Sequence, residues 1–171
     1  MPKKGKKGQK VSKKDKKQSE DDSQESNEEE IAIEIPKFPL TKEQLKDAVK
    51  AVNLIWKYGD DEGETFDPDL LEKHLQTKLV SFLAYWIDLA TFCIQHPRKD
   101  PPYSYRVNIN TSYLFYTLLK NDWIFAQEIE QIFPDFYPKI LEAVISPNIP
   151  DEYRQIFLSI WHTKYFQMAL P

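Results

Sequence analysis

Cysteine and glycine are scarce in this chain of 171 residues, which has a single cysteine, Cys93, and four glycines. One cysteine cannot form an internal disulfide, so a small secreted fold stapled by disulfides is excluded. Few glycines leave few tight turns of the kind that join antiparallel strands. No apolar run follows the amino-terminal lysines, so no secretory signal is expected. We expect an intracellular protein, cytoplasmic, nuclear or both.

Aromatic residues are absent from residues 1–34, although the chain has 4 Trp, 9 Tyr and 10 Phe. The same segment is divided by charge: residues 1–17 are rich in lysine, and residues 18–34 contain acidic residues and no basic one. Such a composition cannot bury enough apolar surface to offset the entropy lost on ordering. We therefore predict a disordered, charge-polarised tail over residues 1–34 and a helical domain over residues 35–171.

The spacing of apolar residues after the tail predicts an all-α fold, either an irregular helical bundle or stacked helix pairs, with about five to six helices. Thr41 with Gln44, and Asp67 with Pro68, are typical of helix starts. The expected helices cover residues 42–58, 68–95 with or without a break near Gln76, 135–145 and 151–168. Another is expected to start at a cap between Asn108 and Ser112 and to end near Leu119. Asn121–Asp122 either breaks or bends the helical pattern, and Asp122 is expected to cap a further helix that ends at Ile132. No segment alternates like a strand, and no repeat of fixed period is present.

Residues 79–94 are apolar almost all round, which predicts a buried central helix. They are fewer than the roughly 20 residues that a membrane span requires. One narrow stripe of this helix holds the polar residues Lys78, Ser81, Tyr85, Asp88 and Gln95. We expect this stripe to meet water, and Asp88 to be a solvent-facing residue rather than a buried functional acid.

Motifs for catalysis, cofactors or metals are missing from the sequence. It has no Gly-rich phosphate loop and no Gly-x-Ser-x-Gly element, and its three histidines do not share a ligand spacing. The segment Asp61–Glu72 has the length of a calcium loop, but Phe66 occupies the position that requires glycine. Cys93 lies in an apolar helix and is expected to be a buried small side chain. We expect no enzyme, no cofactor and no metal site.

The tail lysines form the first candidate site. The site comprises eight of the nine tail lysines: Lys3, Lys4, Lys6, Lys7, Lys13, Lys14, Lys16 and Lys17. Their charge suits an acidic polymer such as RNA, DNA or an acidic protein tail, and their spacing also resembles the short pattern read by nuclear import receptors. A tail that only solubilises the protein is the other interpretation. No arginine for base readout and no aromatic for stacking accompanies the lysines.

Ser19 and Ser26 are candidate phosphorylation sites, because each has an acidic residue three positions later, Asp22 and Glu29. Acidophilic kinases prefer this arrangement. A phosphate at either serine would strengthen the negative charge of residues 18–34 and its attraction for the neighbouring lysines. A tail without such regulation is the alternative.

Exposed aromatic residues are the remaining candidate sites. Tyr103 and Tyr105 lie in a proline-rich connector that misses the WW-domain ligand pattern by one position, and this connector either contacts a partner or folds back on the body. Trp161 and Phe166 point to different sides of the last helix, so one core cannot bury both. With Tyr165 they are a candidate partner interface.

These observations favour a non-enzymatic protein–protein interaction module, an adaptor whose charged tail makes salt-sensitive contacts to an acidic partner. The alternative is a nucleic-acid-associated factor, ribosomal or chromatin-linked, in which the tail lysines bind the nucleic acid. The two functions differ in the expected surface of the body, since clustered positive charge on one face is typical of nucleic-acid binding.

Overall fold

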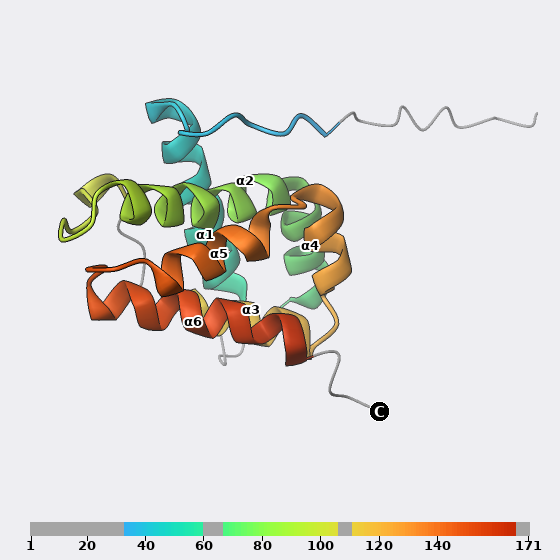
Figure 1. The fold of residues 1–171 in the computed structure, drawn as a ribbon. Helices are drawn as coiled ribbons and strands as arrows, with labels where there is room; N and C mark the ends of the chain where they lie inside the picture. Colours follow the sequence, from blue (N-terminus) through green and yellow to red (C-terminus); the bar gives the residue numbers. More distant parts are fainter. Residues whose placement is uncertain (1–32, 60–66, 106–110, 167–171) are drawn as a thin grey trace, which may run out of the picture. The chain divides into compact units, whose positions relative to one another are not determined.

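The computed structural model describes residues 33–59, 67–105 and 111–166, which belong to one compact unit (Figure 1). These residues contain six α-helices and one 3-10 turn, and no strand is present among them. The elements are α1 (Lys42–Gly59), α2 (Pro68–Gln95), η1 (Tyr103–Tyr105), α3 (Thr111–Lys120), α4 (Ala126–Ile132), α5 (Phe136–Ile145) and α6 (Asp151–Phe166). The predicted all-α class is confirmed. The predicted disorder of the tail concerns residues that, up to residue 32, lie outside the described ranges.

The first two helices begin where their capping residues predict. At α1, the Thr41 amide donates to Gln44 Oε1 at 3.0 Å and the Gln44 amide donates to Thr41 Oγ1 at 3.2 Å, which is a reciprocal capping box. At α2, Asp67 accepts from the Asp69 amide at 3.0 Å, and Pro68 occupies the first helical position. Local sequence therefore sets both helix starts.

α2 is continuous over 28 residues, without a break at Gln76 or Thr77. The Thr77 hydroxyl donates to the carbonyls of Lys73 and His74, both at 3.1 Å, so this polar side chain is satisfied inside the helix. At 1.5 Å per residue the helix is about 42 Å long. This length lets α2 pass through the whole body and contact elements on several sides.

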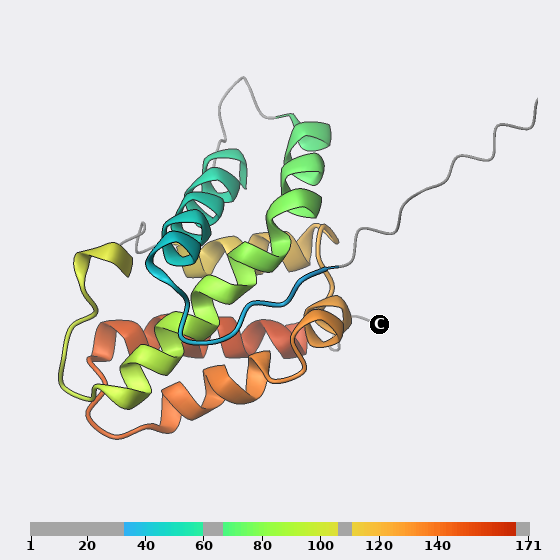
Figure 2. The same ribbon diagram turned by 90° about the horizontal axis from the view of Figure 1, so that it is seen from above.

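The other helices are arranged around α2. Its first half pairs with α1, and Figure 2 shows this pair projecting from the remaining helices. Its second half packs against α5, while α6 lies between α5 and α3. Figure 1 shows α2, α5 and α6 as successive levels of the body. The arrangement is an irregular bundle, one of the two architectures that the sequence predicts.

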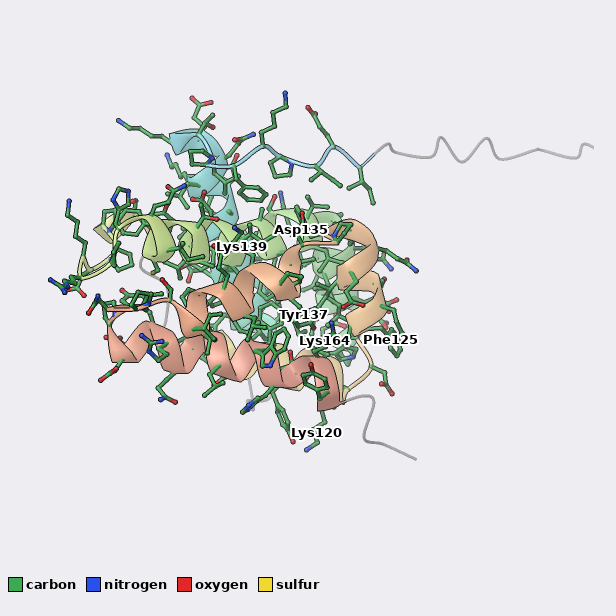
Figure 3. All side chains as sticks on the ribbon, in the orientation of Figure 1. Lys120, Phe125, Asp135, Tyr137, Lys139 and Lys164 are labelled. Carbon is green, nitrogen blue, oxygen red and sulfur yellow. The ribbon has the colours of Figure 1, made fainter. Side chains whose placement is uncertain are left out.

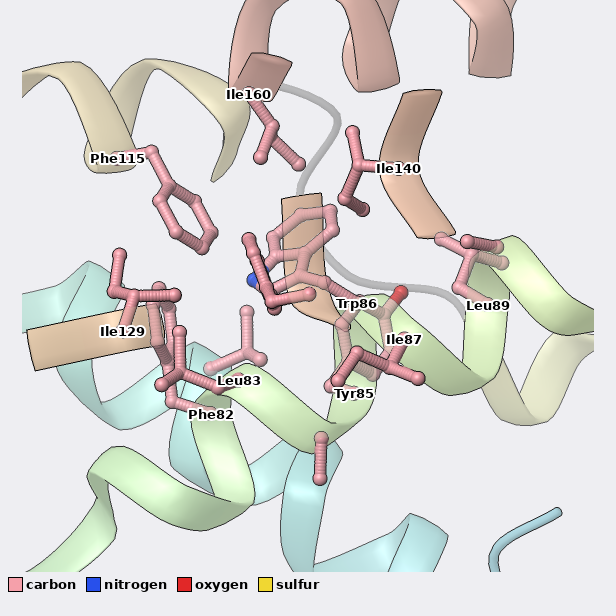
Figure 4. Packing of buried hydrophobic residues seen from close by; sticks show 14 of the residues in the cluster. Phe82, Leu83, Tyr85, Trp86, Ile87, Leu89, Phe115, Ile129, Ile140 and Ile160 are labelled. Carbon is pink, nitrogen blue, oxygen red and sulfur yellow. The ribbon is translucent and has the colours of Figure 1, made fainter. Parts of the chain in front are cut away.

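The core is centred on Trp86 of α2, whose side chain is fully buried (Figure 4). Three aromatic rings meet it at steep angles: Phe82, Tyr85 and Phe115, with centroid distances of 6.4, 4.9 and 5.6 Å. Edge-to-face contacts of this kind suit the quadrupoles of the rings. Aliphatic residues from several helices, including Ile129, Ile140 and Ile160, complete the same cluster.

An extended segment, residues 33–41, lies across α2 before α1 begins; we call it the strap. Two contacts hold it. The Leu40 amide donates to Asp88 Oδ1 on α2 at 2.9 Å, and the Phe38 ring lies 6.1 Å from the ring of Phe133 at the end of α4. The strap therefore connects helices that are far apart in the sequence.

Arg154 of α6 stabilises the turn between α5 and α6. Its guanidinium donates to the carbonyl of Val144 and, at 3.0 Å, to that of Ser146, both at the carboxyl end of α5. These carbonyls would otherwise lack helical partners. The turn is also joined to the end of α2, because the Arg98 amide donates to the Asn148 carbonyl at 2.8 Å.

The start of α4 differs from the prediction. Asp122 does not cap the helix, because it has a φ of 56° and belongs to the turn that follows α3. α4 begins at Ala126, and the Phe125 amide donates to Glu128 Oε2 at 3.3 Å. The sequence Asn121–Asp122 favours a left-handed turn as well as a cap, and the turn is what forms.

Candidate functional site

The strongest candidate site in the described part of the chain is an apolar groove beside the strap, which we call the strap groove. It has a volume of about 380 Å³. It is lined by Ile35, Pro36, Phe38, Ile87, Thr91, Ile132, Phe133, Pro134, Asp135 and Lys139. The strap, α2, α4 and α5 all contribute to this lining, so the groove exists only when the strap is docked. Its size lies at the small end of the range for ligand pockets.

Two isoleucines of the strap are exposed, and Ile35 is the one that lines the strap groove. Ile35 is 49% exposed and Ile33, two residues earlier, is 60% exposed. Asp135, just before α5, and Lys139 on α5 supply charge at the groove, and Figure 3 labels both. The Lys139 ammonium lies 2.9 Å from Glu142, so its charge is partly compensated. The site therefore offers apolar contact surface with a few charged groups to orient a ligand.

A smaller cavity of about 230 Å³ lies on the other side of the strap. Its polar lining residues are Glu34, Gln44, Asp47 and Ser81, and its apolar ones include Leu40 and Ala48. This cavity is more acidic than the strap groove. Of the two sides of the strap, the one toward α4 and α5 is better suited to apolar side chains.

A second candidate surface is found at the end of α6, and we call it the aromatic patch: Phe125, Trp161, Lys164 and Tyr165. Tyr165 is 47% exposed and meets half-buried Trp161 edge to face at a centroid distance of 5.7 Å. Phe125, 43% exposed, precedes α4 at the same end of the body (Figure 3). Exposed aromatic residues of this kind are enriched in protein interfaces.

Lys164 holds the aromatic patch together. Its ammonium lies 5.3 Å from the ring centroid of Tyr137 and 5.8 Å from that of Trp161, within the range of a cation–π contact. It also lies 2.7 Å from Glu130 Oε1 of α4. The patch is thus fixed in place by contacts between α4, α5 and α6. The side chain of Phe166, which the sequence predicts as part of this interface, lies outside the described residues.

Tyr105 is half-buried against the body. Its hydroxyl donates to Asp88 Oδ2 at 2.7 Å, and its ring lies 5.5 Å from that of Phe92. The hydroxyl of Tyr85 donates to the Tyr105 carbonyl. The connector therefore folds back on the body at this residue, which was one of the two alternatives. The side chain of Tyr103 is outside the described residues.

The expectation that Asp88 faces water is wrong. The residue is 2% exposed, and Tyr85 on the same stripe is buried as well. Lys78 and Gln95, at the two ends of the stripe, are exposed as predicted. The middle of the stripe is covered by the strap and by η1, whose donors satisfy both carboxylate oxygens of Asp88. Helical periodicity predicts which face of a helix is polar. It does not predict which distant segment of the chain covers that face.

Burial sets the protonation of the groups around Asp88. It raises the pKa of the Tyr105 hydroxyl, and the hydrogen bond to the Asp88 carboxylate and its negative charge raise this pKa further. Burial also raises the pKa of Tyr85. Both hydroxyls therefore stay protonated and remain hydrogen-bond donors over the physiological range. The cluster is a structural anchor for the strap and η1.

Cys93 is buried, and burial raises the pKa of its thiol to about 12. A nucleophilic cysteine needs the opposite, a lowered pKa and access to solvent. Within the described ranges no group of three or more metal-ligating side chains is found. His74 stacks on Tyr58 at 5.0 Å, and His96 lies 4.6 Å from Phe92. Most of the acidic loop after α1 lies outside the described residues.

The tail sites are also outside the described residues. This applies to the lysines between positions 3 and 17 and to Ser19 and Ser26, whose roles stay predictions. The strap groove was not predicted. The sequence signal for it is the alternation Ile31-Ala32-Ile33-Glu34-Ile35, which places apolar residues just before a proline-rich joint.

One described helix, α2, is long and apolar enough to cross a membrane by length and composition alone. In its most apolar window 56% of the residues are buried inside the body. The core helix of a globular domain passes the same test, so this finding is weak evidence for a span. The contacts of α2 with α1 and α5 account for much of its apolar surface.

Comparisons with known proteins add no relationship: no family model, no curated protein and no solved structure matches this chain. The features of this chain that bear on function are therefore the strap groove, the aromatic patch and the distribution of charge.

Proposed function

We propose that this chain is a non-enzymatic protein-binding module. The helical body binds a protein partner, and the charge-polarised tail adds a salt-sensitive contact to an acidic region of that partner. The observation that carries the proposal is the strap groove, which has seven apolar lining residues and exposed Ile35 at its edge. Apolar surface that remains open on a folded body is typical of interaction sites.

The chemistry of the strap groove describes the segment it would accept. A volume of about 380 Å³ suits a few apolar side chains of a partner, such as those spaced along one face of a helix or extended peptide. Asp135 and Lys139 would orient the charged residues beside them. The aromatic patch at the end of α6 offers a second contact, to which Tyr165 and Phe125 contribute exposed rings.

The test compares two arginine substitutions in the full-length chain. After the partner is captured by cross-linking and identified, its affinity is measured for wild type, Ile35→Arg and Ile145→Arg. Ile145 is a matched control, because it is 71% exposed on α5 and does not line the groove. We expect Ile35→Arg to weaken binding at least tenfold, and Ile145→Arg to bind like wild type. Equal affinities for all three proteins would contradict the role of the groove.

The tail contact has its own measurement. Replacing the lysines between positions 3 and 17 by glutamine should make the affinity for the same partner less dependent on salt, because fewer charges are screened. Phosphorylation at Ser19 or Ser26 should act in the same direction, since it adds negative charge next to the lysines. If the salt dependence of the affinity were unchanged, only the helical body would contact the partner, and the proposed role of the tail would be contradicted.

A second candidate function, association with nucleic acid, has support from a different part of the body. The outer face of α1 carries four lysines, Lys42, Lys46, Lys50 and Lys57, all exposed. Clustered positive charge on one face is the usual footprint of a nucleic-acid site. Recovery of the captured partner after nuclease treatment separates the two functions: a protein partner bound directly is retained, and one bridged by nucleic acid is lost.

A further inference from the structure

A row of lysines runs along the outer face of α1. Lys42, Lys46, Lys50 and Lys57 are all exposed, and we call them the lysine row. At 100° per residue these four positions fall within an arc of about 80° and extend over about 22 Å of the helix. The opposite face of α1 holds the buried residues Leu45, Ala48, Ala51, Val52 and Ile55. The row therefore points directly away from the core.

Three of the four lysines oppose the local stability of α1, whereas Lys57 lies in its last turn, where the helix dipole favours positive charge. Lys42–Lys46 and Lys46–Lys50 are like-charge pairs four residues apart, a spacing that destabilises a helix. Lys42 also lies in the first turn, where the helix dipole disfavours positive charge. Among the described residues only Lys50 of the row is in an ion pair, with Asp47 at 3.6 Å. Natural proteins break local rules of this kind mainly at functional or strained sites.

The surroundings of the lysine row indicate the class of its ligand. Every exposed residue of α1 is polar: Lys42, Glu43, Gln44, Lys46, Asp47, Lys50, Asn53 and Lys57. A protein interface has an apolar centre, which this face lacks. Isolated surface ion pairs with an acidic peptide contribute little. A nucleic acid differs, because its dense charge condenses counterions that are released when lysines replace them.

The form of the nucleic acid follows from the shape of the face. No aromatic residue is exposed on α1, so the stacking contacts that single strands need are not offered. The ridge of a helix fits the major groove of B-form DNA, which is about 12 Å wide. The major groove of A-form RNA is too deep and narrow. We propose that the lysine row binds the phosphate backbone of double-stranded DNA without reading its sequence.

This proposal rests on the second function given above and is independent of protein binding at the strap groove. It is tested with the full-length chain by fluorescence anisotropy on a labelled DNA duplex of mixed sequence, at several salt concentrations. One variant changes the four lysines of the row to glutamine. The control removes the same charge elsewhere, at four exposed residues of the body: Lys73, Arg98, Lys99 and Lys120.

Each phosphate contact contributes about −0.9 to the slope of log affinity against log salt for B-form DNA. We expect the row variant to lose about 3 to 4 units of this slope, and to bind at least tenfold more weakly at low salt. The control should keep the wild-type slope. Equal slopes for the two variants would overturn the proposal. DNA binding would then depend on the tail lysines or on the total positive charge of the chain.

Two further arms complete the test. Unlabelled RNA duplex and single-stranded DNA are added as competitors, and the proposal is overturned if either competes as well as the DNA duplex. A variant with arginine at the four positions keeps the charge and should keep the wild-type slope. If this variant also lost slope, the loss in the glutamine variant would come from disturbing α1 and not from removing charge. Binding of the protein partner through the strap groove should be unchanged in the row variant. Failure of one function thus does not imply failure of the other.

Discussion

Trp86 and Asp88 are two residues apart on α2 and both are buried, yet they are held in different ways. Trp86 packs among aromatic rings that come from its own helix and from α3. Asp88 is surrounded by donors that come from the strap and from η1, at sequence separations of 48 and 17 residues. One side of the helix is closed by apolar packing, and the other by hydrogen bonds to irregular segments.

The stability of the two buried sides of α2 therefore depends on different interactions. The Trp86 side depends on shape and volume, because apolar contacts have no direction. The Asp88 side depends on specific donors, because a buried carboxylate is costly unless its oxygens are satisfied. Substitutions on the two sides should therefore differ in size and in their response to pH.

The largest expected effect is on the Trp86 side. Trp86→Ala removes a fully buried side chain and leaves a cavity among Phe82, Tyr85 and Phe115, so the free energy of unfolding should fall by about 3–5 kcal/mol. Denaturation by urea, followed by circular dichroism, measures this loss. Trp161→Ala is the control, because half-buried Trp161 should cost less. Equal losses from the two substitutions would contradict the placement of Trp86 at the centre of the core.

The Asp88 side should show an intermediate effect. Asp88→Asn replaces one acceptor by an amide donor, which opposes either the Leu40 amide or the Tyr105 hydroxyl, and should lower the free energy of unfolding by about 1–3 kcal/mol. Tyr105→Phe should cost a similar amount, and the two losses should not add, because both disrupt one hydrogen bond.

Asp100→Asn is the matched control for this experiment. Asp100 is exposed, and its substitution should change the free energy of unfolding by less than about 0.5 kcal/mol. If Asp88→Asn were as mild as this control, the polar side of α2 would not be an anchor, and the contrast with the Trp86 side would disappear.

The smallest effect concerns pH and Cys93, a buried thiol on α2. Burial raises the pKa of this thiol to about 12 in the folded state, whereas a thiol in the unfolded chain has its ordinary pKa of 9.0. The unfolded chain thus loses this proton first, and stability falls as the pH rises above 9. Between pH 8 and 10, wild type should lose about 1 kcal/mol more than Cys93→Ala. Parallel pH profiles for the two proteins would show that the thiol is accessible to water.

The helices could be predicted from the sequence because their signals are local. The capping pair at Thr41 and Gln44 and the Asp67–Pro68 start act within three residues, and the apolar spacing of α1 gives its buried face directly. The all-α class follows from the same signals. The start of α4 is an exception, because Asp122 lies in a left-handed turn and does not cap the helix.

The candidate sites could be predicted only in part. The exposure of Tyr165 follows from its position on α6, but the strap groove is formed by four elements that are distant in the sequence. The prediction that Asp88 faces water is wrong for the same reason. Its partners Leu40 and Tyr105 lie in segments without helical periodicity. Long-range contacts of irregular segments leave no pattern in a single sequence.

The bond from the Leu40 amide to Asp88 makes one backbone proton a reporter for the docking of the strap. In a helix interior, each amide donates to the carbonyl four residues earlier, and its exchange with solvent follows the opening of whole turns. Leu40 lies outside any helix, so its exchange follows the release of the strap from α2. Hydrogen exchange at this one amide, compared with exchange at the core of α2, would report whether the strap groove opens while the rest of the body stays folded.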